Sequence, residues 1–181
     1  MPKELIPTQE KPEVRVATIA DAADIARIQH DSWIATYVND NAGIRREDIA
    51  DHLGDLTSRS DRWKDRILRK PGTIEILVLR EEDRVIGFCQ VERIRDIGHV
   101  NALYLDPEFA HRGLGSQLLQ KGINWLGVDR PLELEVASYN DSAIRFYQRH
   151  GFREQGPAKS LQLRNGKLLP LTLMVRDVVE K

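Results

Sequence analysis

The stretch Leu103-Tyr-Leu-Asp-Pro-Glu-Phe-Ala-His-Arg-Gly-Leu-Gly-Ser-Gln-Leu-Leu119 combines the end of a strand, a short loop and the start of a helix. Leu103 to Leu105 is apolar and aromatic, as is typical of a buried strand. Asp106-Pro107 ends it, because proline gives no N–H to a ladder and biases the residue before it away from helix. Gly113 and Gly115 then leave unpaired backbone N–H groups accessible at the positive end of a helix dipole. The stretch predicts a phosphate-binding loop.

This glycine pair differs from the two commonest phosphate-binding motifs. No Lys-Ser/Thr follows it, as a P-loop requires, and Gly113-Leu-Gly-Ser-Gln-Leu118 lacks the third glycine of a dinucleotide fingerprint. As a whole, the stretch resembles the acetyl-CoA-binding motif of the GNAT superfamily of acyltransferases, Gln/Arg-x-x-Gly-x-Gly/Ala after a Pro-containing turn. Ala110 stands where that motif has Gln or Arg, and Arg112 is the residue that we expect to supply the missing charge.

A second stretch, Asn140-Asp-Ser-Ala-Ile-Arg-Phe-Tyr-Gln-Arg-His-Gly-Phe152, resembles the second GNAT motif, Asn-x-x-Ala-x-x-Phe/Leu-Tyr-x-x-x-Gly-Phe. The two motifs have the order and separation of the family, and the resemblance covers residues 14–177. It implies an α+β fold with α/β/α layers and a mixed, mostly antiparallel sheet, whose central parallel pair is splayed for CoA. We expect one such domain over residues 1–181, with residues 1–12 as a flexible arm.

The remaining pattern predicts the secondary structure. Thr18 and Asp21 form a capping box before a helix that ends near Tyr37, and a polar helical segment follows to about Leu68. Strands are predicted at residues 14–17, 73–79, 84–91, 99–105 and 132–137. The last two flank a helix and should be parallel neighbours. Asn165-Gly166 predicts a hairpin, and Pro170 predicts an edge or bulge in the final strand.

Composition excludes several classes of protein. The 41% of apolar and 30% of charged residues are ordinary for a soluble globular protein, and a net charge of −1 gives no footprint for nucleic acid or an anionic membrane. Cys89 is the one cysteine and is expected to be an inert core residue. No apolar run approaches the roughly 20 residues of a membrane span, and the N-terminus has no signal-peptide pattern. We predict a cytoplasmic protein without a metal site.

The GNAT resemblance implies the contacts to acetyl-CoA. Main-chain groups of Leu103, Tyr104 and Leu105 should pair with the pantetheine where the sheet splays, typically at a bulge. The backbone N–H groups of one continuous segment should hold the pyrophosphate: His111, Arg112, Gly113, Leu114, Gly115 and Ser116. Asn140 either contacts the pantetheine or caps its helix.

The family's reaction transfers acetyl directly from acetyl-CoA to an amine, which requires a general base and a general acid. Tyr147 matches the family position that protonates the departing thiolate, since a phenol with a pKa of about 10 stays protonated at neutral pH; a core role is its alternative. Glu135 is one candidate base, because Leu134-Glu-Val-Ala-Ser-Tyr-Asn140 resembles the run of GNAT enzymes that acetylate protein N-termini. His99 on the preceding strand and water relayed by backbone are the others, and both side chains have a solvated strand position as the alternative.

The acceptor is an amine, either a small molecule or a protein N-terminus. Trp33 and Tyr37 are candidate substrate-binding residues, and Trp63 is a further candidate; core packing is the alternative for all three. Two functions follow from the resemblance: an N-acetyltransferase, or a GNAT-fold module that binds acyl-CoA without turnover. Tyr147 with Glu135 favours the enzyme, whereas Ala110 favours the module. The oligomeric state is open, with the C-terminal hairpin as a candidate edge for a homodimer.

Overall fold

A mixed β-sheet of seven strands organises the computed structural model, which describes residues 11–110 and 112–178. Its strand order is β1-β2-β3-β4-β5-β9-β6, and every neighbouring pair is antiparallel except β4 and β5. The strands are β1 (Glu13–Val16), β2 (Ile74–Glu81), β3 (Arg84–Ile94), β4 (Ile97–Leu105), β5 (Leu132–Ala137), β9 (Leu171–Arg176) and β6 (Arg153–Pro157). The predicted crossover therefore produces a central parallel pair, as the motif order implied.

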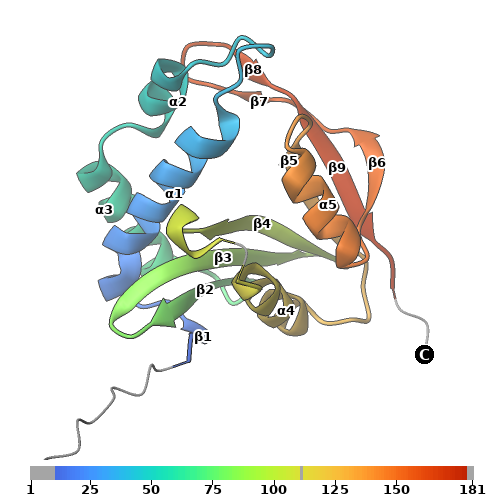
Figure 1. Cartoon of the computed structure of the whole chain (residues 1–181). Helices are drawn as coiled ribbons and strands as arrows, with labels where there is room; N and C mark the ends of the chain where they lie inside the picture. Colours follow the sequence, from blue (N-terminus) through green and yellow to red (C-terminus); the bar gives the residue numbers. More distant parts are fainter. Residues whose placement is uncertain (1–10, 111, 179–181) are drawn as a thin grey trace, which may run out of the picture.

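Helices cover both faces of this sheet (Figure 1). The helices are α1 (Ala22–Tyr37), α2 (Arg46–Leu53), α3 (Leu56–Arg69), α4 (Leu114–Leu126) and α5 (Asp141–Arg149), with short 3-10 turns at Ile19–Asp21 and Pro107–Phe109. The chain is thus layered α/β/α, which confirms the predicted α+β fold class.

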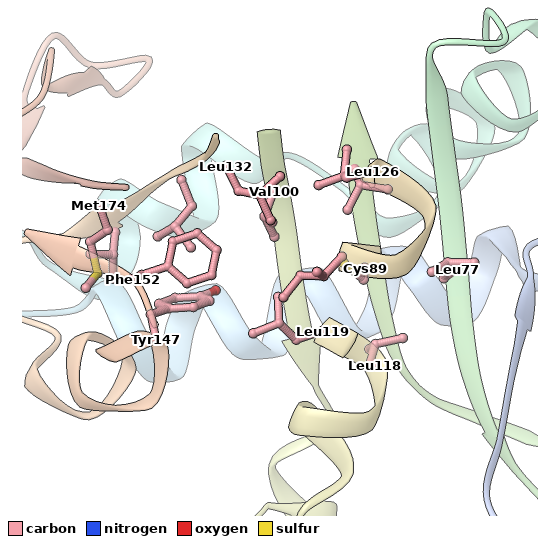
Figure 2. Packing of buried hydrophobic residues seen from close by; sticks show 14 of the residues in the cluster. Leu77, Cys89, Val100, Leu118, Leu119, Leu126, Leu132, Tyr147, Phe152 and Met174 are labelled. Atoms are coloured by element: carbon pink, nitrogen blue, oxygen red, sulfur yellow. The ribbon is translucent and has the colours of Figure 1, made fainter. Parts of the chain in front are cut away.

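Alternation along β2 explains the two layers. Leu77 and Leu79 pack in a core cluster with α4 and α5, whereas Ile76 and Val78 pack in a second cluster with α1 and α3. Successive strand side chains point to opposite faces, so a continuously apolar strand serves two cores. Figure 2 shows the first cluster, in which Tyr147 lies beside other buried apolar residues of the sheet and helices.

The central parallel pair separates soon after it begins. β4 and β5 pair at Gly98 with Leu132 and at His99 with Glu133, and the described register goes no further along β4. Beside this point the β3–β4 register shifts between Gln90 and Val91, which is the irregularity that bends strands apart. The predicted splay is therefore present.

Two details of the sequence pattern differ from the structure. The polar segment after α1 is two helices, because Gly54 ends α2 at a φ of 69° and the Asp55 carboxylate then accepts from the Ser58 N–H to cap α3. The prediction that Pro170 lies in the last strand was wrong. Pro170 precedes β9, and β9 lies inside the sheet between β5 and β6.

The predicted C-terminal hairpin forms a separate small sheet of β7 (Leu161–Gln162) and β8 (Leu168–Leu169). Its tip is tied to α2, since Lys167 Nζ and Asn165 Nδ2 both donate to the Asp48 carboxylate at 2.6 Å. Leu169 is fully buried against residues of α1 and α2. Within its own chain, the hairpin closes over the end of the β4–β5 gap (Figure 1).

Candidate active site

A groove of about 610 Å³ runs along the open side of β4, between α5 and the N-terminus of α4. One wall is formed by Leu103, Tyr104 and Leu105. These are the three residues whose main-chain groups were predicted to contact the pantetheine. Because β5 has left β4 at this point, the facing edge of β4 has backbone groups available to an extended ligand. Ser32 and Thr36 of α1 close the groove, and Ser32 Oγ donates to the Leu105 carbonyl at 3.1 Å.

The loop that leads to α4 is fixed by one buried carboxylate. Asp106 is 3% exposed and accepts from Arg27 Nη1 at 2.9 Å, from Arg84 Nη2 at 2.6 Å and from the Glu108 N–H at 3.2 Å. Burial alone would raise the pKa of Asp106, but these partners outweigh it and lower that pKa. The loop is therefore held by an ionised aspartate at neutral pH.

The start of α4 exposes backbone donors to the groove. Gly113 has a φ of 75°, a left-handed conformation that favours glycine, and it turns the chain into the helix. The Ser116 N–H already donates to the Gly113 carbonyl at 3.1 Å. No described residue accepts from the amides of Gly113, Leu114 and Gly115, which makes them the candidate donors to an anion. A Cβ on Gly115 would lie 3.4 Å from Leu105 and 3.5 Å from Phe146, in ordinary van der Waals contact, so a longer side chain here would extend between these two residues.

The residues before these glycines have different surroundings. Ala110 lines the groove. Arg112 is bound by Glu81 of β2, with Nη2 to Oε1 at 2.5 Å and Nη1 to Oε2 at 3.1 Å. His111 lies outside the described residues. We expected Arg112 to bring a positive charge to acetyl-CoA. In the structure its guanidinium is instead paired with Glu81 of the same chain.

Tyr147 of α5 lines the inner part of the same groove and is 9% exposed. Burial, followed by the proximity of Cys89 and Tyr37, raises the pKa of Tyr147 far above the ordinary phenol value. Its ring packs edge-on against Phe152 at 5.9 Å (Figure 2), so the phenol is both a core side chain and a protonated group facing the groove.

Of the two roles that the sequence left open for Asn140, the structure shows the helix cap. Asn140 Oδ1 accepts from the Ala143 N–H at 3.1 Å and so caps α5. The same residue also lines the groove. The cap therefore positions the helix that presents Tyr147.

A second groove of about 400 Å³ lies at the same β4–β5 gap but opens to the other face of the sheet. Glu133 and Glu135 alternate along β5 with leucines that belong to the core cluster of α4 and α5, so the two carboxylates point away from that cluster. Trp33 and Tyr37 line this groove, as do Leu161 and Leu169 of the hairpin. Trp63 does not; it is 5% exposed and packs edge-on against Phe88.

One histidine and two carboxylates meet in this second groove. His99 and Glu135, the two candidate bases, both line it. His99 Nδ1 lies 4.0 Å from Glu133 Oε2. Glu135 has no ion-pair or hydrogen-bond partner within the two ranges that the structure describes. Sequence reasoning missed Glu133, whose position two residues before Glu135 on one strand is the signal that could have identified it.

Tyr104 lines both grooves. Its hydroxyl accepts from Trp33 Nε1 at 2.9 Å and lies 3.1 Å from the Tyr37 hydroxyl, and Tyr139 Oη donates to the Tyr37 carbonyl at 2.8 Å. Burial raises the pKa of Tyr104 to about 12. These hydrogen-bonded aromatic side chains lie where the two grooves meet. The sequence indicated Tyr104 only as a main-chain contact.

Comparison with known families identifies this arrangement. The profile of the acetyltransferase (GNAT) family matches residues 32–152, a range that contains the open part of β4, the glycine turn and α5. The chain belongs to the GNAT family. It is accordingly an acyltransferase, and acetyl-CoA is its co-substrate.

Individual GNAT relatives agree with this assignment. The chain is 30% identical over 126 residues to the L-amino acid N-acetyltransferase AaaT of Escherichia coli. This match covers 63% of this chain and 74% of the relative. It is 27% identical over 145 residues to the spermidine N(1)-acetyltransferase of Thermoplasma acidophilum, a match that covers 78% of this chain and 88% of the relative. The structure resembles that of the PaiA N-acetyltransferase of T. acidophilum in complex with coenzyme A, with a TM-score of 0.75, 21% identity and coverage of 93% and 99%.

The described α-helices of this GNAT protein are 8 to 16 residues long. Across residues 11–110 and 112–178, none combines the length and the apolar character that crossing a bilayer would require.

Proposed function

We propose that this protein is an N-acetyltransferase that moves the acetyl group of acetyl-CoA directly to a primary amine. The observation that supports this most is the placement of two grooves on opposite faces of the sheet, at one gap and with Tyr104 in common. A donor and an acceptor that enter from the two faces would meet without a covalent enzyme intermediate. Direct transfer requires the thioester and the amine to be held next to each other, and it requires no nucleophilic side chain of the protein.

The residues of the first groove suit acetyl-CoA. The free amides of Gly113, Leu114 and Gly115 would hold the pyrophosphate at the helix dipole, and the unpaired edge of β4 would bind the amide-rich pantetheine as an added strand. Acetyl-CoA supplies an acyl group already activated as a thioester. The protein's task is to orient that group toward the second groove.

Tyr147 is the proposed general acid. As the amine nitrogen bonds to the carbonyl carbon, the C–S bond breaks, and the phenol gives its proton to the sulfur that leaves. Because burial raises the pKa of Tyr147, the phenol holds its proton throughout the neutral range. Solvent returns a proton to the phenolate afterwards.

Glu135 is the proposed general base. It lines the second groove and has no cation partner in the described part of the chain, whereas His99 is paired with Glu133. An unpaired carboxylate beside the acceptor attracts an ammonium group and accepts the proton that this group must lose before attack. His99 with Glu133 is then a second, weaker attraction for the same cation.

The acceptor groove also favours one class of amine. Its described lining contains two carboxylates, several leucines and aromatic rings, but no lysine or arginine. A free amino acid would bring its α-carboxylate next to Glu133 and Glu135 without a cation to pair it. We therefore propose an amine with an apolar substituent and no adjacent carboxylate, as in a simple alkylamine, a polyamine or a peptide N-terminus.

A matched pair of acceptors tests this. Release of the CoA thiol is measured with acetyl-CoA and either 2-phenylethylamine or L-phenylalanine, which differ by one carboxylate. We expect kcat/KM to be at least tenfold higher for 2-phenylethylamine, the equivalent of about 1.4 kcal/mol. A preference for L-phenylalanine would contradict the acceptor class, and no turnover with 2-phenylethylamine, spermidine or an alanine-initiated peptide would contradict the proposed activity.

A further inference from the structure

A third groove, of about 480 Å³, lies along α3 and shares no lining residue with the donor or acceptor grooves. Its walls come from α1, α3 and the start of β2. They are formed by Gln29, Arg59, Arg62, Trp63, Asp65, Arg66, Arg69, Lys70, Pro71 and Ile74. We call it the basic groove, because five of these side chains are cationic and one is anionic.

Two of the five cations are neutralised within the chain. Arg69 Nε lies 3.0 Å from Asp65 Oδ1, and Lys70 Nζ lies 2.5 Å from Glu75 Oε1. Arg59, Arg62 and Arg66 are different. Among the residues that the structure describes, none of these three has a carboxylate within 4.0 Å.

The contacts of the three arginines are to neutral oxygens. Arg59 donates to Gln29 Oε1 at 2.7 Å, and both Arg59 and Arg62 donate to the Leu53 carbonyl. Arg66 Nη1 donates to Gln90 Oε1 at 3.0 Å. These bonds orient the guanidinium groups, Arg66 also lies over the Trp63 ring at 5.5 Å, and no carboxylate of the described residues neutralises the three.

Arg59 is the most buried of the three arginines, and like charges lie near it. Burial, followed by the charges of Arg62 and Arg164, lowers the pKa of Arg59 to about 10. Placing like charges close together costs free energy, and an oxyanion bound in the groove would reduce that repulsion.

The spacing of the three arginines suits a phosphate group. Positions 59, 62 and 66 are three and four residues apart, so they lie on one face of α3. Each guanidinium has a planar set of donors that matches two oxygens of a phosphate. The groove has the volume of a small-molecule site, and a chain of net charge −1 lacks the extended basic surface of a nucleic-acid-binding protein.

We propose that the basic groove binds a small molecule bearing a di- or triphosphate group, at a site separate from that of the acetyl donor. Arg59 and Gln29 form its inner end, and Arg62 and Arg66 contact the anion at its mouth.

The test is calorimetric titration of inorganic pyrophosphate into the protein, with one molar equivalent of CoA present so that the donor groove is occupied without an excess of CoA, which itself carries a diphosphate. Arg62 and Arg66 are exposed, so the variant Arg62→Gln/Arg66→Gln should fold. We expect one-site binding that this variant weakens roughly tenfold or more, since charge-assisted hydrogen bonds are lost. Lys64→Gln is the matched control, because it removes one charge from the same helix outside the groove and should leave the affinity unchanged.

Three results would overturn the proposal: no binding of pyrophosphate to the unaltered protein, unchanged binding to the Arg62→Gln/Arg66→Gln variant, or equal weakening by Lys64→Gln. Sulfate at the same ionic strength should bind more weakly than pyrophosphate; equal binding would reduce the groove to a nonspecific patch and would also overturn it. A parallel titration with ADP separates the sources. Tighter binding than pyrophosphate assigns a nucleotide, and equal binding assigns the free diphosphate group. Neither outcome depends on the acetyl-transfer activity.

Discussion

The donor and acceptor grooves lie at one gap in the sheet, yet they are built in opposite ways. The donor groove is formed largely by two continuous stretches, residues 103–116 and 140–149, and its proposed contacts are mostly main-chain groups. The acceptor groove is assembled from side chains of α1, β4, β5 and the C-terminal hairpin, which are far apart in sequence. A site made of backbone is encoded locally and tolerates substitution, whereas a site made of side chains depends on the whole fold.

This contrast predicts where substitutions act. Changes on the donor side should alter affinity for acetyl-CoA only when they fill the groove or bend the loop. Changes on the acceptor side should alter turnover or the choice of amine without affecting the binding of acetyl-CoA.

The largest effect is expected at Tyr147, the side chain on the donor side with a chemical role. Tyr147→Phe should lower kcat by about 10² to 10⁴, the range for a general acid, and leave the Kd of acetyl-CoA within about twofold. Steady-state kinetics and calorimetry measure the two quantities. Tyr139→Phe removes a phenol that lines neither groove but donates to the Tyr37 carbonyl, so its loss of activity should be much smaller. A parallel loss of acetyl-CoA binding in Tyr147→Phe would show a structural role instead.

The second prediction concerns the base on the acceptor side. Glu135→Gln should lower kcat/KM roughly 10²-fold at neutral pH, and the loss should shrink as pH rises, because a larger fraction of the amine is then already deprotonated. Rates over a pH series measure this. His99→Asn should cost much less; the reverse order of the two variants would transfer the role of base to His99.

A smaller effect is expected from filling the donor groove. Gly115→Val places a branched side chain between Leu105 and Phe146 and should weaken acetyl-CoA binding about tenfold, equal to about 1.4 kcal/mol. Gly72→Val is the control, since a Cβ there meets no atom within 4 Å and the residue lines neither groove. Unchanged affinity in Gly115→Val would place the donor elsewhere.

The last prediction concerns stability, with little effect expected on the chemistry. Asp106→Asn should lower the free energy of unfolding by about 1 to 3 kcal/mol at neutral pH, because charge-assisted bonds to Arg27 and Arg84 are weakened. The pKa of Asp106 is lowered in the folded state, so its contribution is present above the ordinary aspartate pKa of about 3.9 and is lost as pH falls through the lower folded value. Urea unfolding of both proteins across this range should therefore converge in acid; a constant difference would mean that the charge is not what stabilises the loop.

The donor side was also the part that sequence could predict. The glycine turn and the capped α5 follow from local rules on Pro, Gly and Asn, and the parallel pair follows from the strand–helix–strand order; its splay was implied by the resemblance to the GNAT motifs. The placement of Arg112 on Glu81 could not be predicted, since it depends on how β2 lies beside the loop.

The acceptor side was predicted only in fragments. Trp33, Tyr37, His99 and Glu135 were identified separately, but nothing local indicates that they face one groove with Glu133 and Tyr104. That grouping results from the β4–β5 register and from the hairpin closing over α2. Pairings over a hundred residues apart are set by tertiary packing, which single-sequence patterns do not report.

The most direct test of the two-groove account is a pair of amide NMR titrations of this 20.7 kDa protein, one with acetyl-CoA and one with 2-phenylethylamine in the presence of CoA. The account predicts two separate sets of shifted signals: Gly113, Leu114 and Gly115 with acetyl-CoA, and His99, Glu133 and Glu135 with the amine, with Tyr104 responding to both. Acetyl-CoA that leaves the glycine turn unshifted, or an amine that shifts the same set as acetyl-CoA, would contradict it.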